Sequence, residues 1–213
     1  MKKVLLISIA LFAFILTSNA QVSFGPKVGL NLANVYGDNM DDAEMKIGAQ
    51  VGVAVDFAFS DAISLQTGLL FSQKGFKESE GDFTSTFNIN YLDIPVHAVY
   101  GLDLGGNKLQ FFVGPYVGVG LTGKAKLEMG DMEEEIDFQF VNDVTDADED
   151  KYPVKRFDVG LDFGAGFMVS NFQIQAQYGL GMANLMPKYD GEDPEDKMSN
   201  GVINLSVTYF FGK

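Results

Sequence analysis

The sequence predicts an all-β protein, an eight-stranded antiparallel up-and-down transmembrane β-barrel with short periplasmic turns and long extracellular loops. Three observations support this prediction. Apolar residues alternate with small or polar residues in eight segments after residue 21, which is the pattern of strands with two unlike faces. The connections between these segments alternate between short and long, as in outer-membrane barrels. Most segments reach or approach the ~9–11 residues that a tilted strand needs to cross a bilayer.

The composition excludes several other classes of protein. The chain has 213 residues, of which 46% are hydrophobic, so it is not a disordered protein. It has no Cys, which excludes disulfides, Cys-ligated zinc sites and a thiol nucleophile, and it has one His. The formal net charge of −14 argues against a nucleic-acid partner, because nucleic-acid binding needs a basic face.

Residues 1–20 are predicted to be a cleaved secretory signal peptide, which leaves residues 21–213 as the outer-membrane β-barrel domain. Lys2 and Lys3 precede a mostly apolar stretch. Ser18 and Ala20 are the small residues expected before a signal-peptidase cleavage site, and cleavage there would make Gln21 the first residue of the mature chain. A retained membrane anchor is the alternative. The apolar stretch has about 14 residues, fewer than the ~20 that span a bilayer, so cleavage is favoured.

The first four predicted strands span residues 24–32, 47–59, 63–72 and 92–98. The second shows the alternation most clearly, since every second residue from Ile47 to Phe59 is apolar and the residues between them are small or polar. The opposite faces of the four strands hold these polar residues: Lys27, Asn31, Gln50, Asp56, Ser64, Gln66, Ser72, Asp93 and His97.

The last four predicted strands span residues 109–121, 157–167, 172–180 and 203–211. In the first two of them, glycine occupies much of the face opposite the apolar one. The polar residues on these opposite faces are Gln110, Tyr116, Asp158, Asp162, Gln173, Gln175, Gln177, Asn204, Ser206 and Thr208.

The connections predict which end of the barrel faces outward. The short ones are residues 60–62, 101–108 and 170–171, and the long polar ones are 34–46, 75–86, 122–155 and 184–200. Alternate connections of an up-and-down barrel emerge at the same end, so all the long ones are expected at one end and both ends of the barrel domain at the other.

The apolar faces are predicted to contact lipid. A soluble secreted ligand-binding barrel, which would hide its apolar face inside, gives the same alternation. The opposite face, however, is rich in glycine, Gln, Asn and Asp, which suits a narrow polar interior, whereas a water-facing surface would carry more Lys and Glu. We therefore expect an outer-membrane location, reached through the periplasm, with the lipid bilayer as a partner.

The inferred interior holds a set of ionisable residues that we expect to form a polar network: Lys27, Asp56, Lys74, Asp93, His97, Asp158 and Asp162. Charges in a narrow lumen must be paired or hydrated, and side chains just fill the interior of an eight-stranded barrel. An ionic plug is therefore expected, with a selectivity filter as the alternative. His97 and Asp93 lie ~13 Å apart along one strand, too far to pair directly, so we predict no catalytic residues.

The connection over residues 122–155 is strongly acidic, and residues 127–140 within it retain some alternation, which suggests a hairpin projecting beyond the membrane. Its acidic run from Asp143 to Asp150 lacks the spacing and the turn glycine of an EF-hand loop. We therefore expect a solvated acidic surface with no metal site and no cofactor. Any partner at this end is expected to be cationic or bridged by divalent ions.

Several short motifs resemble those of a known family. They include Tyr91-Leu92-Asp93-Ile94-Pro95-Val96, where Asp93 stands in place of a Glu, and Gly114-Pro115-Tyr116-Val117-Gly118. Through these motifs the mature chain resembles the outer-membrane β-barrel domain of Bacteroidetes, a group that contains the PorT-like proteins. Phe211 is followed by Gly212 and Lys213, whereas family members often end on an aromatic residue.

The resemblance implies the fold and the location, and most members of the family have no defined activity. It does not by itself imply a role in protein secretion. The predicted function is therefore a structural or cell-surface interaction role without catalysis, carried out by a monomer with a largely plugged lumen. A small-solute porin is the alternative, and a soluble ligand-binding barrel is a weaker one.

Overall fold

The computed structural model describes residues 21–130 and 132–212, so the predicted signal peptide lies outside the described residues. Its strands, with a short 3-10 helix η1 (Val144–Asp146), are β1 (Gln21–Gly37), β2 (Glu44–Ala58), β3 (Ile63–Glu80), β4 (Phe83–Asp103), β5 (Asn107–Met129), β6 (Met132–Phe140), β7 (Tyr152–Val154), β8 (Phe157–Val169), β9 (Phe172–Gly181) and β10 (Met198–Tyr209).

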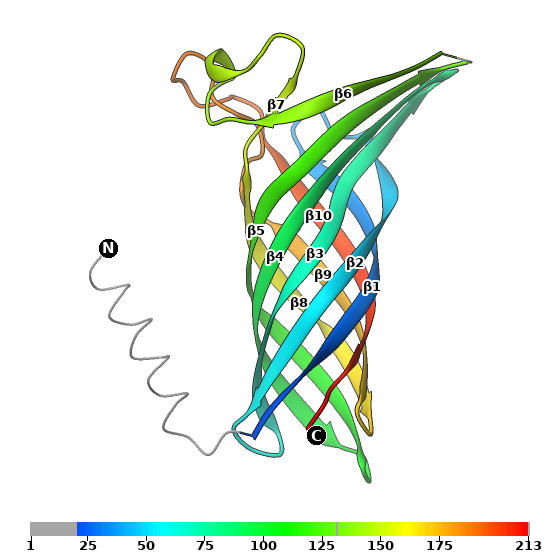
Figure 1. Cartoon of the computed structure of the whole chain (residues 1–213), viewed down its shortest axis with the longest axis vertical. Helices are drawn as coiled ribbons and strands as arrows, with labels where there is room; N and C mark the ends of the chain where they lie inside the picture. The colour runs from blue at the N-terminus through cyan, green and yellow to red at the C-terminus, as the bar shows by residue number, and fades with distance from the viewer. Residues whose placement is uncertain (1–20, 131, 213) are drawn as a thin grey trace.

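Within the described residues, eight antiparallel strands close into a ring in the order β1-β2-β3-β4-β5-β8-β9-β10, with β10 pairing back to β1. Figure 1 shows the resulting barrel of tilted strands. The ring confirms the predicted eight-stranded barrel, and β6 and β7 lie outside it. No helix among the described residues is long and apolar enough to cross a bilayer.

The short turns join β2 to β3, β4 to β5, and β8 to β9, and they lie at the same end as the start of β1 and the end of β10 (Figure 1). This arrangement confirms the prediction that the long connections share the other end. Closure of the ring also pairs every strand on both sides, which removes the unpaired backbone groups that hydrocarbon cannot solvate.

Two of the predicted long loops are largely strand. Over residues 75–86, β3 and β4 stay paired, from the Gly75–Asn88 pair to the Glu80–Phe83 pair. Over residues 122–155, β5 runs on to Met129 and the chain returns as β6. The β5–β6 pairing agrees with the hairpin that the alternation of residues 127–140 suggested. The extension over residues 75–86 was not predicted because, beyond the bilayer, both faces of a sheet can meet water, so a strand there needs no apolar face.

Side chains alternate between the inside and the outside of the barrel as predicted. On β1, Val28 and Leu30 are more than half exposed on the outer face, whereas Lys27 and Asn31 are buried inside. The same holds around the ring, where large apolar residues such as Phe111, Phe157 and Leu205 point outward. The barrel therefore presents an apolar surface outside and holds its polar residues in its interior.

Candidate functional site in the barrel interior

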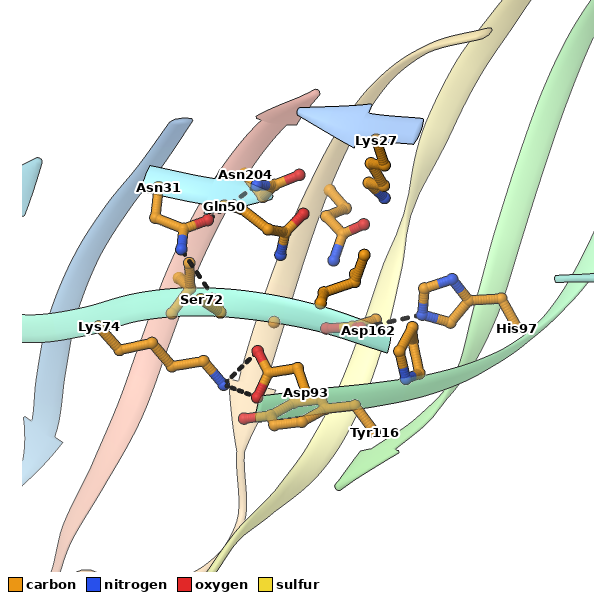
Figure 2. Close-up of a pocket in the computed structure, with 15 residues that line it drawn as sticks. Lys27, Asn31, Gln50, Ser72, Lys74, Asp93, His97, Tyr116, Asp162 and Asn204 are labelled. Carbon is orange, nitrogen blue, oxygen red and sulfur yellow. Dashed lines mark hydrogen bonds and ion pairs between the residues drawn. The ribbon is translucent and has the colours of Figure 1, made fainter. Parts of the chain in front are cut away.

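An ion cluster lies in the lumen, built by strands that face one another across it. Lys74 Nζ on β3 lies 3.0 Å from Asp93 Oδ2 on β4 and 3.0 Å from Asp158 Oδ2 on β8. Asn200 donates to Asp158 Oδ2 at 2.9 Å, and the Tyr116 hydroxyl lies 3.2 Å from the same oxygen. Figure 2 shows Lys74 reaching Asp93 beside Tyr116. One lysine thus pairs with two buried carboxylates, and hydrogen bonds from Asn200 and Tyr116 further stabilise Asp158.

Aromatic rings and a glycine shape the space around Lys74. Its Nζ lies 4.4 Å from the centre of the Tyr116 ring and 5.0 Å from that of Tyr91, distances at which a cation is attracted to the ring face. Gly118 leaves room for the Asp93 carboxylate, because a Cβ at that position would lie 2.6 Å from Asp93 Oδ1. The interior glycines therefore provide the volume that the charged side chains occupy.

His97 pairs across the lumen with Asp162, another residue of the predicted interior network. Its Nε2 lies 2.9 Å from Asp162 Oδ2 on β8 (Figure 2). Its ring stacks on Phe112, with the ring centres 5.4 Å apart. The sequence does not specify this pair, because a partner across the lumen depends on the tilt and register of the closed barrel. Among the described residues, no Ser or Thr hydroxyl is hydrogen-bonded to the ring of His97.

Two of the predicted network residues bond to neutral partners. Lys27 Nζ donates to Gln175 Oε1 at 2.8 Å, and Asp162 is close enough to Lys27 to interact with it electrostatically. Asp56 accepts from the Ser64 hydroxyl at 2.7 Å, nearer the short-turn end. One small cavity is lined by five of the predicted network residues: Lys27, Lys74, Asp93, His97 and Asp162. Asp158 is connected to them through its ion pair with Lys74, and Asp56 does not line this cavity.

Buried amides extend the network between the strands. Asn204 donates to Asn31 Oδ1 at 2.7 Å, and Asn31 in turn donates to the Ser72 hydroxyl at 3.0 Å. Gln173 donates to Gln110 Oε1 at 2.7 Å. Fully buried polar groups of this kind are stable only when they are hydrogen-bonded, so these contacts favour one arrangement of the interior.

Apolar side chains close the barrel above the ion cluster. The cluster that they form consists of Val35, Phe76, Ile89, Tyr91, Val154, Leu185 and Met198. Val154 comes from β7 and Leu185 from the connection between β9 and β10, and each is 1% exposed. Segments outside the ring therefore fold inward over the mouth that the long connections surround.

The other end of the lumen is also narrowed by apolar residues. Ala54, Met168 and Phe210 pack together, and Phe210 is fully buried. Phe210 points inward because it lies between the partly exposed Tyr209 and the exposed Phe211, so the alternation of β10 continues past its last residue.

The space that remains around the ion cluster is small. The cavity among the charged residues has a volume of about 30 Å³, room for one or two water molecules. Gln50 Oε1 and Asn204 Oδ1 are buried and have no hydrogen-bond partner among the residues that the structure describes, and both residues line this cavity. A space of about 240 Å³ at the short-turn end is lined partly by Ser23, Asp56 and Lys108. Among the described residues no group of His, Asp and Glu is placed to hold a metal ion.

The acidic connections outside the barrel are held by local bonds. Lys124 Nζ lies 2.6 Å from Glu135 Oε2, a contact that lowers the pKa of the Glu135 carboxyl and raises the pKa of Lys124. Asp143 accepts from the backbone and hydroxyl of Thr145 and from the Gly191 N–H at 2.6 Å, and these donors lower its pKa. Asp143 thus ties the connection between β6 and β7 to the one between β9 and β10.

Several solved structures are similar to this chain. Ail, the attachment invasion locus protein of Yersinia pestis, is 17% identical with a TM-score of 0.43, over 90% of this chain and 99% of that one. Neisserial surface protein A is 11% identical with a TM-score of 0.43, over 88% and 97%. The N-terminal β-barrel domain of Pseudomonas aeruginosa OprF is 10% identical with a TM-score of 0.34, over 87% and 97%.

No curated protein matches the chain. The family model described as outer membrane protein beta-barrel domain matches residues 17–187, well over half of the sequence. The match agrees with the closed ring of eight strands and with the apolar outer surface of the barrel. The chain therefore belongs to the outer membrane protein β-barrel domain family and is embedded in the lipid bilayer of the outer membrane.

Proposed function

We propose that this protein is a closed outer-membrane barrel with a structural or cell-surface interaction role, and that it neither conducts solutes nor catalyses a reaction. The observation that carries the proposal is the filled interior. The cavity in the ion cluster has a volume of about 30 Å³, and apolar side chains fill the lumen on one side of it and narrow the lumen on the other. A hydrated solute larger than a water molecule has no path through such an interior.

The surroundings of His97 support the absence of catalysis. One ring nitrogen faces Asp162, and the ring face lies on Phe112. A histidine that activates a nucleophile needs that nucleophile within hydrogen-bond reach. No such hydroxyl contacts the ring in the part of the chain that the structure describes. We assign His97 and the other charged residues of the lumen to a polar network that fills the barrel.

Planar-bilayer conductance tests the closed barrel. The refolded mature chain is expected to give no stable unitary currents, whereas an established porin in the same bilayer gives them. Stable unitary currents from the wild-type chain would overturn the proposal and support a small-solute channel. Release of the protein into the soluble periplasm without detergent would contradict its membrane location and favour a soluble ligand-binding barrel.

Three finer assignments belong to the same proposal. Residues 1–20 are a signal peptide that is removed before Gln21, which N-terminal sequencing of the exported protein checks. The mature barrel is a monomer, which mass measurement in detergent checks. The segment from Tyr91 to Val96 supports a place among the PorT-like proteins of Bacteroidetes.

The extracellular end is the surface that this role would use. The connections there carry clusters of acidic residues, including Glu133, Glu134 and Glu135, and Asp190, Glu192 and Asp193. A partner at this end is expected to be cationic or bridged by divalent ions, because opposite charge raises the rate and the specificity of association.

A further inference from the structure

Four strands extend beyond the ring and form a projecting sheet (Figure 1, upper right). It consists of residues 76–80 of β3, 83–90 of β4, 122–129 of β5 and 132–137 of β6. The pairing runs across its tip from Glu80 to Phe83, from Phe83 to Met129, and from Met129 to Met132. The sheet therefore keeps its backbone hydrogen bonds outside the barrel.

The face of the projecting sheet that continues the lumen side is apolar at its tip. Phe83, Met129 and Met132 lie side by side on this face and are 40%, 51% and 64% exposed. With Leu127 they line a groove of about 510 Å³ whose rim includes Glu133 and Glu134. An exposed row of large apolar side chains next to charged residues is typical of an interaction site.

The loop that covers the rest of this face stops short of the tip. The Tyr152 ring of β7 packs 5.6 Å from Phe87 and 5.1 Å from Phe138, which are nearer the barrel. β7 pairs with β6 over Phe138–Phe140 alone. Beyond that point, within the described part of the chain, residues 132–137 of β6 have a strand on one side only.

The opposite face of β6 is acidic. Glu133, Glu135 and Asp137 alternate with Met132, Glu134 and Ile136, so successive side chains of the open edge point to an acidic face and to a largely apolar one. Lys124 and Lys126 of β5 neutralise part of this acidic face through ion pairs of 2.6 and 3.1 Å with Glu135 and Glu133. Each lysine also pairs with a second carboxylate, Lys124 with Asp137 and Lys126 with Glu128. This face therefore keeps an excess of negative charge.

We propose that the open edge of β6 binds a strand-forming segment of another protein in which basic and large apolar residues alternate. The segment adds to the sheet beside residues 132–137, and its backbone completes the hydrogen bonds of that edge. Its apolar side chains cover Met132 and Ile136, and its Lys or Arg side chains face Glu133, Glu135 and Asp137. The proposal rests on the surface-interaction role proposed above and names the chemistry of the partner.

The test uses the full mature chain in lipid nanodiscs and a fluorescent peptide that alternates Lys with Val. Fluorescence anisotropy is expected to detect binding that weakens as salt screens the charges. A peptide of the same composition with its Lys and Val in separate blocks is expected to bind about tenfold more weakly. Equal affinities for the two peptides would overturn the proposal, because charge alone would then explain binding.

A matched pair of variants tests the location. Replacing Met129 and Met132 with Ser is expected to weaken binding of the alternating peptide about tenfold. Met45 and Met182 lie outside this tip and are 58% and 67% exposed. Replacing both of them with Ser is expected to leave the affinity for the alternating peptide unchanged. Unequal gel mobility of heated and unheated samples shows that both variants fold. Equal loss in the two variants, or no loss in either, would overturn the proposal.

The remaining outcomes separate other occupants from a peptide strand. If the wild-type chain formed a dimer and the variant with Ser at positions 129 and 132 did not, the tip would be a contact between two copies of the chain. That result would overturn the proposal. If protein-free lipid vesicles competed with the peptide for binding, the tip would be a lipid-binding surface. That result would also overturn the proposal. Conductance by the wild-type chain would contradict the closed barrel but not peptide binding, so the two proposals fail by different measurements.

Discussion

Lys74 Nζ on β3 lies 3.0 Å from Asp158 Oδ2 on β8, although these two strands are not neighbours in the ring. The ion pair therefore spans the lumen, and with Asp93 it joins three strands at one point. Charged side chains that meet across a barrel both fill it and fix the separation of its walls. The interior of this protein is thus a packed polar core inside an apolar shell.

Removal of Lys74 should be costly. Lys74→Met leaves the buried carboxylates of Asp93 and Asp158 without their cation, and breaking a buried pair in this way costs about 3–5 kcal/mol of unfolding free energy. Urea unfolding of the folded barrel in detergent measures the loss. Lys197→Met, at an exposed position, should change the stability by less than about 0.5 kcal/mol.

A triple variant separates charge from packing at the same place. Adding Asp93→Asn and Asp158→Asn to Lys74→Met removes the uncompensated charges, so much of the lost stability should return. If the triple variant were as unstable as Lys74→Met alone, the lysine would act through its volume and not through its charge.

Gly118 should not tolerate a larger residue. Gly118→Ala places a methyl group 2.6 Å from Asp93 Oδ1, so the carboxylate must shift from the position in which it contacts Lys74. The expected cost is about 1–3 kcal/mol of unfolding free energy, which is typical of overpacking. Gly101→Ala is the control, because its nearest neighbouring atoms lie 3.8 Å away. Equal stability of the two variants would show that the interior relaxes freely around Asp93.

Cysteine labelling should map the closed part of the lumen. Because the chain contains no Cys, a single introduced thiol is a specific probe. Ser64→Cys lines the space at the short-turn end and should react with a water-soluble maleimide, whereas Ser72→Cys lines the small cavity and should not react until the barrel unfolds. Rapid labelling of Ser72→Cys in the folded barrel would indicate an open lumen.

The link between the two acidic connections should weaken in acid. Hydrogen bonds from Thr145 and Gly191 favour the charged form of Asp143 and lower its pKa in the folded protein. The stabilisation is therefore present above the ordinary aspartate pKa and is lost as the pH falls through the lowered value. Acidification below that value should speed limited proteolysis of these connections in nanodiscs.

The Asp143 prediction also has a variant and a control. Asp143→Ala should raise the rate of proteolysis several-fold at neutral pH, since the contact to Gly191 is lost. Asp146→Ala, in the same segment, should leave the rate close to that of the wild type. Identical rates in both variants would mean that other contacts hold the two connections together.

The sequence determined the number of strands in the ring, the inward and outward faces, and the ends at which the short and long connections lie. This was possible because the alternation of side chains is a local property of an extended chain, and hydrocarbon on one side makes it strict. The same rule explains where prediction failed. Past the bilayer, residues 75–86 no longer need an apolar face, so the strands there resemble a polar loop, whereas residues 127–140 keep enough alternation to suggest a hairpin.

Only the tertiary structure decided which interior residues meet. The pairing of His97 with Asp162, and of Lys74 with Asp158, depends on the tilt and register of strands that are distant in sequence. Tyr116, Asn200 and Gln175 joined the network for the same reason. A single strand specifies which face a side chain occupies, whereas the distance across a lumen is set by all the strands that close around it.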